Sequence, residues 1–172
     1  MFFIKALFLK GEDPMLDMKQ YLIETFNFND YANKNILKKI KELPDKEACI
    51  KFFSHLINSQ NKWLDRIMKY PAESKLDWWS PVYDLESIEK VWNSSLKTWI
   101  DFLNSKNDNE LFSQTKFIGY DGGTWTAEIK DIALQLNYHS FHHRAQIQTI
   151  IRQQGIEPDF IDYIGVKYKK LS

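Results

Sequence analysis

The chain is poor in the residues that build cross-linked or fibrous proteins. Its 172 residues include one cysteine, six glycines and five prolines. A single cysteine excludes an internal disulfide and any zinc site made of several thiolates, and it fits a reducing cytoplasm. Cys49 precedes Ile50, Phe52 and Phe53 in a helical apolar pattern. This pattern favours a packed core residue over a reactive thiol.

The chain also has no excess of positive or negative charge and no long apolar run. Twenty-three basic and twenty-three acidic residues leave no net charge, so no global field attracts nucleic acid, an anionic membrane or an acidic substrate. No run approaches the ~20 apolar residues that cross a bilayer. We therefore expect neither a nucleic-acid nor a membrane partner.

The first ten residues, MFFIKALFLK, are apolar without forming a secretory signal. Lys5 interrupts the run, no basic region precedes it and no small-residue cleavage site follows it. Helical periodicity begins only at Met18. We therefore divide the chain into residues 1–17, a leader or N-terminal extension, and residues 18–172, one domain large enough for a sizeable core.

Apolar periodicity predicts four long helices in this domain. They extend over residues 18–43, 45–70, 84–104 and 126–154. Pro44 ends the first, and Asp45 is a candidate N-cap of the second. Thr126 is the candidate N-cap of the last helix, and Gly155 is its stop.

The segment from Leu111 to Trp125 breaks the helical pattern. Aromatic residues flank a Tyr-Asp-Gly-Gly-Thr turn there, which predicts a short, poorly regular hairpin. The predicted fold class is all-α: a four-helix bundle with a short hairpin before the last helix. We expect the tail from Ile156 onwards to pack across one end of the bundle.

Three of the four histidines lie in one five-residue stretch, 139–143, inside the last predicted helix. At 100° per residue, His139 and His143 fall on the apolar stripe, whereas His142 lies to its side. Residues four apart have Cβ atoms about 5–6 Å apart, so both rings reach one ion. The alternative is that each is a buried histidine satisfied by neighbouring polar groups, since an unsatisfied one costs ~1–3 kcal/mol.

A metal centre needs a third ligand, and His55 is the only remaining histidine. His55 lies at the edge of the apolar arc of the second helix. This position permits contact with the last helix but does not require it. Gln135 and Gln146, on the same side of the last helix as His139, are candidates to orient a ligand or to support a histidine. Each is equally acceptable as a boundary residue.

Other nearby side chains have less specific interpretations. Arg144 points about 90° from the stripe centre, which predicts a surface or interface salt bridge. Trp78, Trp79 and Trp125 are either pocket walls or core residues. No carboxylate base is evident, because Glu128 precedes His139 by eleven residues, about 16 Å along a helix.

The histidine pattern resembles the DinB/YfiT-like superfamily. A histidine in the second helix is followed far downstream by His139-Ser-Phe-His-His143-Arg144-Ala145-Gln146, with alanine where the family commonly has glycine. The stretch Phe28-Asn-Asp-Tyr-Ala-Asn33 and the tail Asp159-Phe-Ile-Asp-Tyr163 are also similar to that family. The resemblance covers about Met18 to Tyr163.

The resemblance implies a function as well as a fold. It makes His55, His139 and His143 the ligands of one divalent metal ion, and an all-imidazole site suits zinc, nickel, iron or copper alike. Related proteins include bacillithiol transferases and a mycothiol-dependent isomerase. They imply a metal-dependent enzyme that activates a low-molecular-weight thiol, or else water, and acts on a small-molecule substrate such as an electrophile. It also implies a homodimer. The alternative is a non-catalytic metal-binding, stress-response or dimerisation protein.

Overall fold

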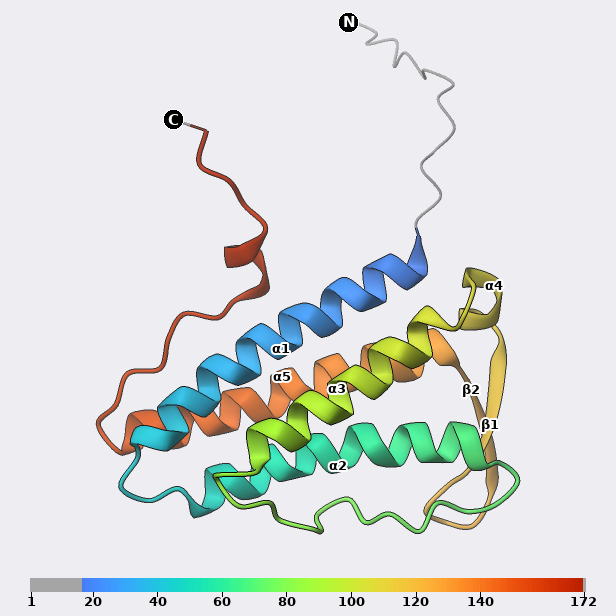
Figure 1. The fold of residues 1–172 in the computed structure, drawn as a ribbon, viewed down its shortest axis with the longest axis horizontal. Helices are drawn as coiled ribbons and strands as arrows, with labels where there is room; N and C mark the ends of the chain where they lie inside the picture. Colours follow the sequence, from blue (N-terminus) through green and yellow to red (C-terminus); the bar gives the residue numbers. More distant parts are fainter. Residues whose placement is uncertain (1–16, 172) are drawn as a thin grey trace, which may run out of the picture.

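The computed structural model describes residues 17–171, so the predicted N-terminal extension lies outside the described residues except for Asp17. The domain is a helical bundle with one hairpin (Figure 1). Its long helices are α1 (Met18–Glu42), α2 (Glu47–Lys69), α3 (Ile88–Asn104) and α5 (Ile129–Gln153). The smaller elements are α4 (Asp108–Leu111), β1 (Gln114–Ile118), β2 (Thr124–Glu128) and the 3-10 helix η1 (Tyr163–Val166). The predicted all-α class, with a hairpin before the last long helix, is confirmed.

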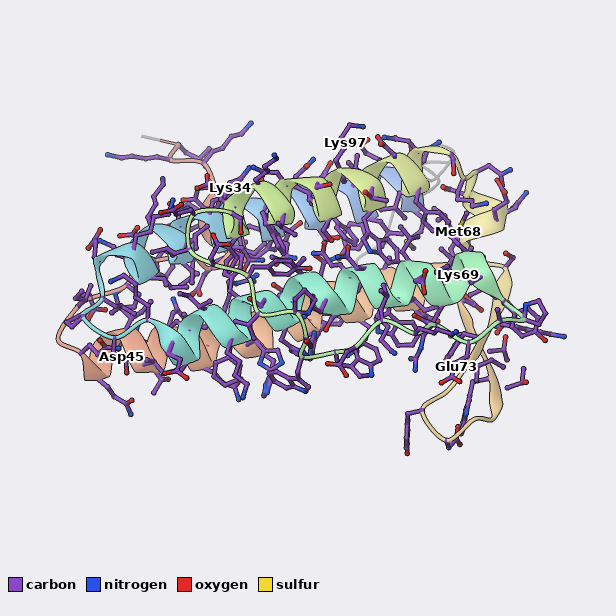
Figure 2. The ribbon with its side chains drawn as sticks, turned by 60° about the horizontal axis from the view of Figure 1, so that its bottom comes forward. Lys34, Asp45, Met68, Lys69, Glu73 and Lys97 are labelled. Atoms are coloured by element: carbon purple, nitrogen blue, oxygen red, sulfur yellow. The ribbon has the colours of Figure 1, made fainter. Side chains whose placement is uncertain are left out.

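The long helices form two layers. In Figure 2, α1 and α3 lie together on one side and α2 and α5 on the other. Each helix of one layer contacts a helix of the other layer, because α5 packs against α1 and α3 against α2. Charged side chains such as Lys97 point away from the bundle (Figure 2). In the described part of the chain, no helix combines the length and apolar character needed to span a bilayer.

The core consists of two apolar clusters, one towards each end of the bundle. Phe53, Trp92 and Ile147 belong to the first cluster, and Phe26, Trp99 and Leu136 to the second. Buried polar side chains lie between the two clusters, and we refer to them as the polar belt. The belt consists of Asn29, Asn33, Gln60, Ser95 and Ser140. Its members bond across helices, as Asn33 Nδ2 does to Ser140 Oγ at 3.0 Å.

Most predicted helix ends are correct to within a few residues. Asp45 accepts a hydrogen bond from Glu47 N at 3.0 Å, although α2 begins at Glu47 with Lys46 in the N-cap position. Gly155 follows α5 with φ of +80°, the left-handed conformation that glycine adopts most easily after a helix. Gly155 therefore marks the end of α5 as predicted, whereas the predicted cap of α2 at Asp45 lies one residue before the observed N-cap, Lys46.

The predicted cap at Thr126 is wrong. Thr126 lies in β2 opposite Lys116, and its hydroxyl donates to the Thr115 carbonyl at 3.0 Å. Pairing with β1 continues as far as Glu128, so α5 starts at Ile129. The hairpin is also more regular than predicted, because each strand contributes five consecutive paired residues.

Two further details differ from the sequence prediction. The third long helix begins at Ile88 instead of Asp84, because a turn precedes it. The C-terminal tail packs Ile156 and Ile161 against the first apolar cluster and then runs back beside α1. There, Tyr163 contacts Phe28 edge-on, with ring centroids 5.0 Å apart. The tail thus covers one side of α1 in addition to one end of the bundle.

Deleting residues 1–16 is expected to leave the bundle and its metal content intact. The first turn of α1 obtains its partners from residues that the deletion retains: Asp17 accepts from Gln20 N at 2.9 Å, and Asp108 accepts from Met18 N and Lys19 N. We expect the free energy of unfolding to change by less than about 0.5 kcal/mol, whereas Asp17→Ala should cost ~1 kcal/mol. Urea unfolding measures both, and loss of cooperativity after the deletion would show that the extension is integral.

Candidate metal centre

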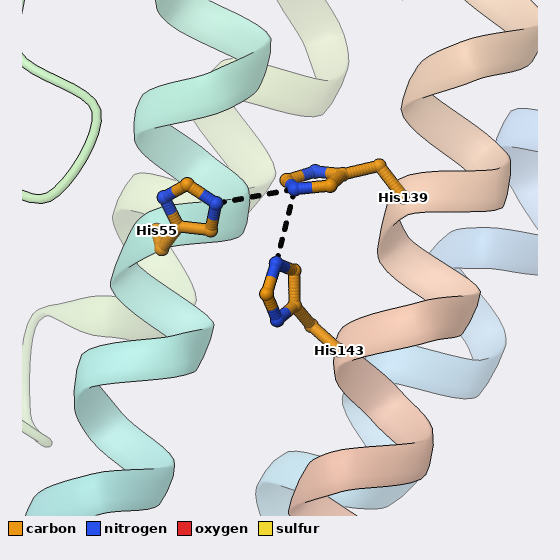
Figure 3. Close-up of side chains that lie close together, drawn as sticks. All are labelled: His55, His139 and His143. Atoms are coloured by element: carbon orange, nitrogen blue, oxygen red, sulfur yellow. Dashed lines mark hydrogen bonds between the residues drawn. The ribbon is translucent and has the colours of Figure 1, made fainter.

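Two neighbouring helices bring three imidazoles to one point. His139 and His143 lie one turn apart on α5, and His55 faces them from α2 (Figure 3). His139 Nε2 is 3.1 Å from His55 Nε2 and 3.0 Å from His143 Nε2. Each residue offers a ligand atom, and these atoms all lie within 4.8 Å of one another. The structure therefore brings together the three histidines that the sequence singled out.

The donor set fits a divalent ion. Imidazole nitrogens bind such ions at ~2.0–2.1 Å, so two of them at right to tetrahedral angles about one ion lie roughly 2.9–3.4 Å apart. The two observed separations from His139 Nε2, 3.1 Å and 3.0 Å, fall within this range. Three nitrogen ligands from two helices leave further coordination positions for a small molecule, as in catalytic sites.

Hydrogen bonds behind two of the rings direct their lone pairs inwards. His55 Nδ1 donates to the Trp78 carbonyl at 2.7 Å, and His143 Nδ1 to Gln146 Oε1 at 2.6 Å. A neutral histidine with its proton on Nδ1 has a lone pair on Nε2. The Nε2 atoms of His55 and His143 are therefore both acceptors.

Mutual hydrogen bonding does not satisfy these acceptors. His139 has at most one proton on Nε2, so it donates to only one of the two neighbouring lone pairs. A cation placed among the three nitrogens instead interacts with every lone pair once His139 carries its own proton on Nδ1. This difference favours a metal centre over three buried histidines that satisfy one another.

Burial keeps the imidazoles neutral. Burial, together with the smaller effects of the nearby His143 and His55 rings, lowers the pKa of His139 to about 4. Burial also lowers the pKa of His55 and of His143, against the opposing effects of the Trp78 carbonyl and the Gln146 amide. Neutral imidazoles bind cations, so the depressed pKa values prepare the cluster for a metal at neutral pH.

The metal-free protein is expected to lose stability as the pH falls from about 6.5 to about 4. Unfolded histidines take up a proton near 6.5, whereas folded His139 does so only near 4. Between these values the unfolded chain binds more protons, so acidification favours unfolding, and this contribution is complete below pH 4. Urea titrations across this range measure the slope.

A matched pair of variants isolates the contribution of the cluster to that slope. His139→Ala should flatten the dependence between pH 6.5 and 4, whereas His142→Ala should leave it unchanged because that side chain is exposed. A slope that survives in His139→Ala would assign the acid sensitivity to other groups.

Two tryptophans of the loop that follows α2 surround the site. Trp79 stacks on His55 with ring centroids 3.8 Å apart and an interplanar angle of 11°. Trp78 lines a pocket of about 270 Å³ beside the histidines. This pocket, which we call the histidine pocket, is lined by His55, Ser59, Trp63, Trp78, Gln135, Leu136 and His139. Trp78 is therefore a pocket wall and Trp79 covers the His55 ring, whereas Trp125 lies on the hairpin with its indole N–H donating to Asp121.

The two glutamines occupy different positions. Gln146 supports His143 from behind, and Gln135 lines the histidine pocket. Ser59 also lines this pocket, and sequence reasoning missed it. Its hydroxyl is buried and has no hydrogen-bond partner within residues 17–171. The only signal for Ser59 was its position four residues after His55 on the same helical face.

Arg144 is buried and forms no salt bridge within the described residues, contrary to the predicted surface or interface salt bridge. It is only 4% exposed, and its Nη1 donates to Asn29, Asn33 and Ser140. Burial lowers the pKa of its guanidinium to about 10, so the group remains charged at neutral pH. The prediction failed because α5 buries a second face against α1, beside the apolar stripe that carries the histidines.

Cys49 and Glu128 take no part in the site. Cys49 is fully buried in the first apolar cluster, as predicted, and burial raises the pKa of its thiol to about 11. Glu128 pairs with Lys130 at 2.7 Å. His142 is exposed on the side of α5, which agrees with its predicted place outside the apolar stripe.

Gln146→Ala is expected to weaken metal binding by ~10–100-fold, the usual effect of losing a hydrogen bond to a ligating histidine. Gln146→Glu, which keeps an acceptor for His143 Nδ1, should retain affinity. Gln148→Ala is the matched control, because within the described chain Gln148 bonds to none of the three histidines. Competition with a chromogenic chelator gives the three affinities. Equal affinity in Gln146→Ala and the wild type would show that Gln146 is only a boundary residue.

The fold and the site together define a helical bundle whose inner face carries a three-histidine cluster able to hold a metal ion. The family model described as the DinB family matches residues 15–170. The chain belongs to the DinB family. A comparison with curated proteins finds no match.

Proposed function

We propose that this protein is a metal-dependent enzyme that activates a low-molecular-weight thiol for transfer to a small electrophile. The observation that carries the proposal is the convergence of three histidine Nε2 atoms beside the histidine pocket. A divalent ion bound there supplies positive charge that lowers the pKa of a thiol or water and so provides a nucleophile at neutral pH. Zinc, nickel and iron(II) all suit the imidazole donors.

The residues of the pocket support a small, partly apolar substrate. Trp63, Trp78 and Leu136 provide apolar walls, whereas Ser59 and Gln135 provide polar groups. The unpartnered hydroxyl of Ser59 is suited to orienting a ligand, since a buried polar group without a partner costs ~1–3 kcal/mol. Trp79, stacked on His55, shields that ring from solvent.

Thiol transfer suits this site better than hydrolysis. Among residues 17–171, the candidate metal group contains histidines and no carboxylate, and Glu128 is engaged by Lys130. A hydrolase of this type usually needs a nearby base to manage protons. In thiol transfer the thiol first releases its proton to solvent, the sulfur then forms a bond to the electrophilic carbon, and the leaving group departs with the bonding electrons.

A two-substrate assay tests this function. Protein loaded with zinc, nickel or iron(II) is mixed with cysteine, glutathione, bacillithiol or mycothiol and with 1-chloro-2,4-dinitrobenzene, and formation of the thioether is followed by absorbance. We expect a rate above that of metal-free protein with at least one thiol, lost in His139→Ala and kept in His142→Ala. Tight metal binding without any metal-dependent rate would overturn the proposal in favour of a non-catalytic metal-binding protein.

We also propose that the protein is a homodimer, as its family resemblance implies. Closed two-fold symmetry is the commonest assembly of homo-oligomeric proteins. Light scattering at micromolar concentration gives the mass, and a monomeric value would reject this assembly.

A further inference from the structure

A second pocket lies between α1 and α5, on the side of α5 that faces α1. Its volume is about 340 Å³, and it is rich in aromatic side chains. We call it the arginine pocket. Its aromatic walls are Tyr21 and Phe28 from α1, Tyr138 and Phe141 from α5, and Tyr163 from the tail. The tail is fixed there by the Tyr163–Phe28 contact and by an ion pair between Lys167 and Glu24 at 2.7 Å.

A buried charge contributes to the lining of this pocket. Arg144 is 4% exposed, and its guanidinium carbon lies 5.9 Å from the Phe28 ring centroid and 6.0 Å from that of Phe141. All its hydrogen bonds to residues 17–171 come from Nη1 and go to neutral oxygens. Within this part of the chain, no carboxylate lies within ion-pair distance of Arg144.

A second polar group in the lining also has no partner. Asn29 is 1% exposed, and its Oδ1 accepts from Arg144, whereas its Nδ2 has no hydrogen-bond partner in the described residues. Nδ2 of an amide is a donor, as are Nε and Nη2 of the guanidinium. The unused groups of Arg144 and Asn29 are therefore donors, next to a positive charge without a counter-ion.

Such a lining is complementary to an anion with an apolar body. A buried charge is costly unless it is paired and hydrogen-bonded, and the planar fork of arginine matches a carboxylate in a bidentate manner. The aromatic walls suit a ring or short hydrocarbon chain attached to that carboxylate. We propose that the arginine pocket binds a small aromatic or aliphatic carboxylate, whose oxygens pair with Arg144 and Asn29.

This site is distinct from the metal centre. His143 faces α2 and its neighbour Arg144 faces α1, so the two pockets open on different faces of α5. No lining residue is common to both. The proposal is therefore independent of the function proposed for the metal centre, and binding should be the same with and without metal.

Calorimetry with 3-phenylpropionate as the probe tests the proposal, with 3-phenylpropionamide as its neutral counterpart. We expect the acid to bind ~10–100-fold more tightly than the amide, the range for hydrogen bonds to a charged group. Arg144→Lys keeps the charge but loses the fork, and it should lower the affinity for the acid at least tenfold. Equal affinities for acid and amide, or no binding of the acid at millimolar concentration, would overturn the proposal.

Variants in the pocket wall keep the test decisive if Arg144→Lys fails to fold. Tyr138 and Phe141 are 66% and 62% exposed, so their joint replacement by alanine spares the core while removing two walls. This double variant should bind the acid at least tenfold more weakly, whereas Tyr120→Ala on the hairpin, where the side chain is 94% exposed, should bind normally. If the wild type binds no acid and is a dimer that the double variant separates, the pocket is instead covered by a second copy of the chain.

Discussion

His139→Ala is expected to abolish stoichiometric metal binding. His139 Nε2 lies within 3.1 Å of the Nε2 atoms of both other histidines, so its loss leaves one ligand on α2 and one on α5. Losing an outer hydrogen bond weakens metal sites by ~10–100-fold, and loss of a direct ligand should exceed about 100-fold. His55→Ala and His143→Ala should behave alike, because each also reduces the donor set to two.

His142→Ala is the matched control for these variants. His142 stands beside His143 on the same helix but is exposed, with ring centroids 5.1 Å apart. Metal content after dialysis, measured by inductively coupled plasma mass spectrometry, should remain near one ion per chain in this variant. Full occupancy with unchanged affinity in His55→Ala would contradict the three-histidine centre, since the ion would then be held by α5 alone.

Removing the ion is expected to lower the thermal midpoint of unfolding by roughly 8–16 °C. An ion present at 1,000 times its dissociation constant stabilises the folded state by ~4.1 kcal/mol. Each kcal/mol shifts the midpoint of a domain of this size by about 2–4 °C. The effect is large because the ligands come from two helices that are far apart in sequence, so the unfolded chain does not offer a preformed site.

Calorimetric scans with added metal and with chelator measure this shift. His139→Ala should unfold at the same temperature in both conditions, whereas His142→Ala should show the full shift. A wild-type midpoint that does not respond to metal would mean that the ion does not bind the folded bundle preferentially.

The sequence predicted the helices and the histidine cluster because both depend on helical periodicity. His139 and His143 lie on the same stripe as Leu136 and Ile147, and the fold buries that stripe towards α2. Periodicity did not place His55 in the cluster, because its position at the edge of the apolar arc permitted contact with the last helix without requiring it. Pairing of α2 with α5 provides that contact, and the order of helices around a bundle does not follow from periodicity alone.

The second buried face of α5 was missed for a physical reason. Ala133, Asn137, Ser140 and Arg144 follow helical spacing and face α1, but small and polar residues do not register as a hydrophobic stripe. Arg144 was therefore assigned to a surface or interface salt bridge. The spacing of these residues was visible in the sequence, but only the packed structure shows what partners they have.

The position of Trp79 over His55 and the start of α5 also depend on tertiary contacts. Trp79 lies in a loop without periodicity, and it is positioned over His55 because its neighbour Trp78 accepts from His55 Nδ1. Thr126 has the side chain of a helix cap, yet strand pairing with Lys116 extends the hairpin beyond it. In both cases contacts made by distant residues outweigh the local signal.

Anomalous diffraction from metal-loaded crystals, at the absorption edge of the added ion, tests the central claim most directly. The three-histidine centre predicts one anomalous peak per chain, within about 2.0–2.2 Å of Nε2 of His55, His139 and His143. A peak at another location, or one that contacts fewer than three of these nitrogens, would contradict it.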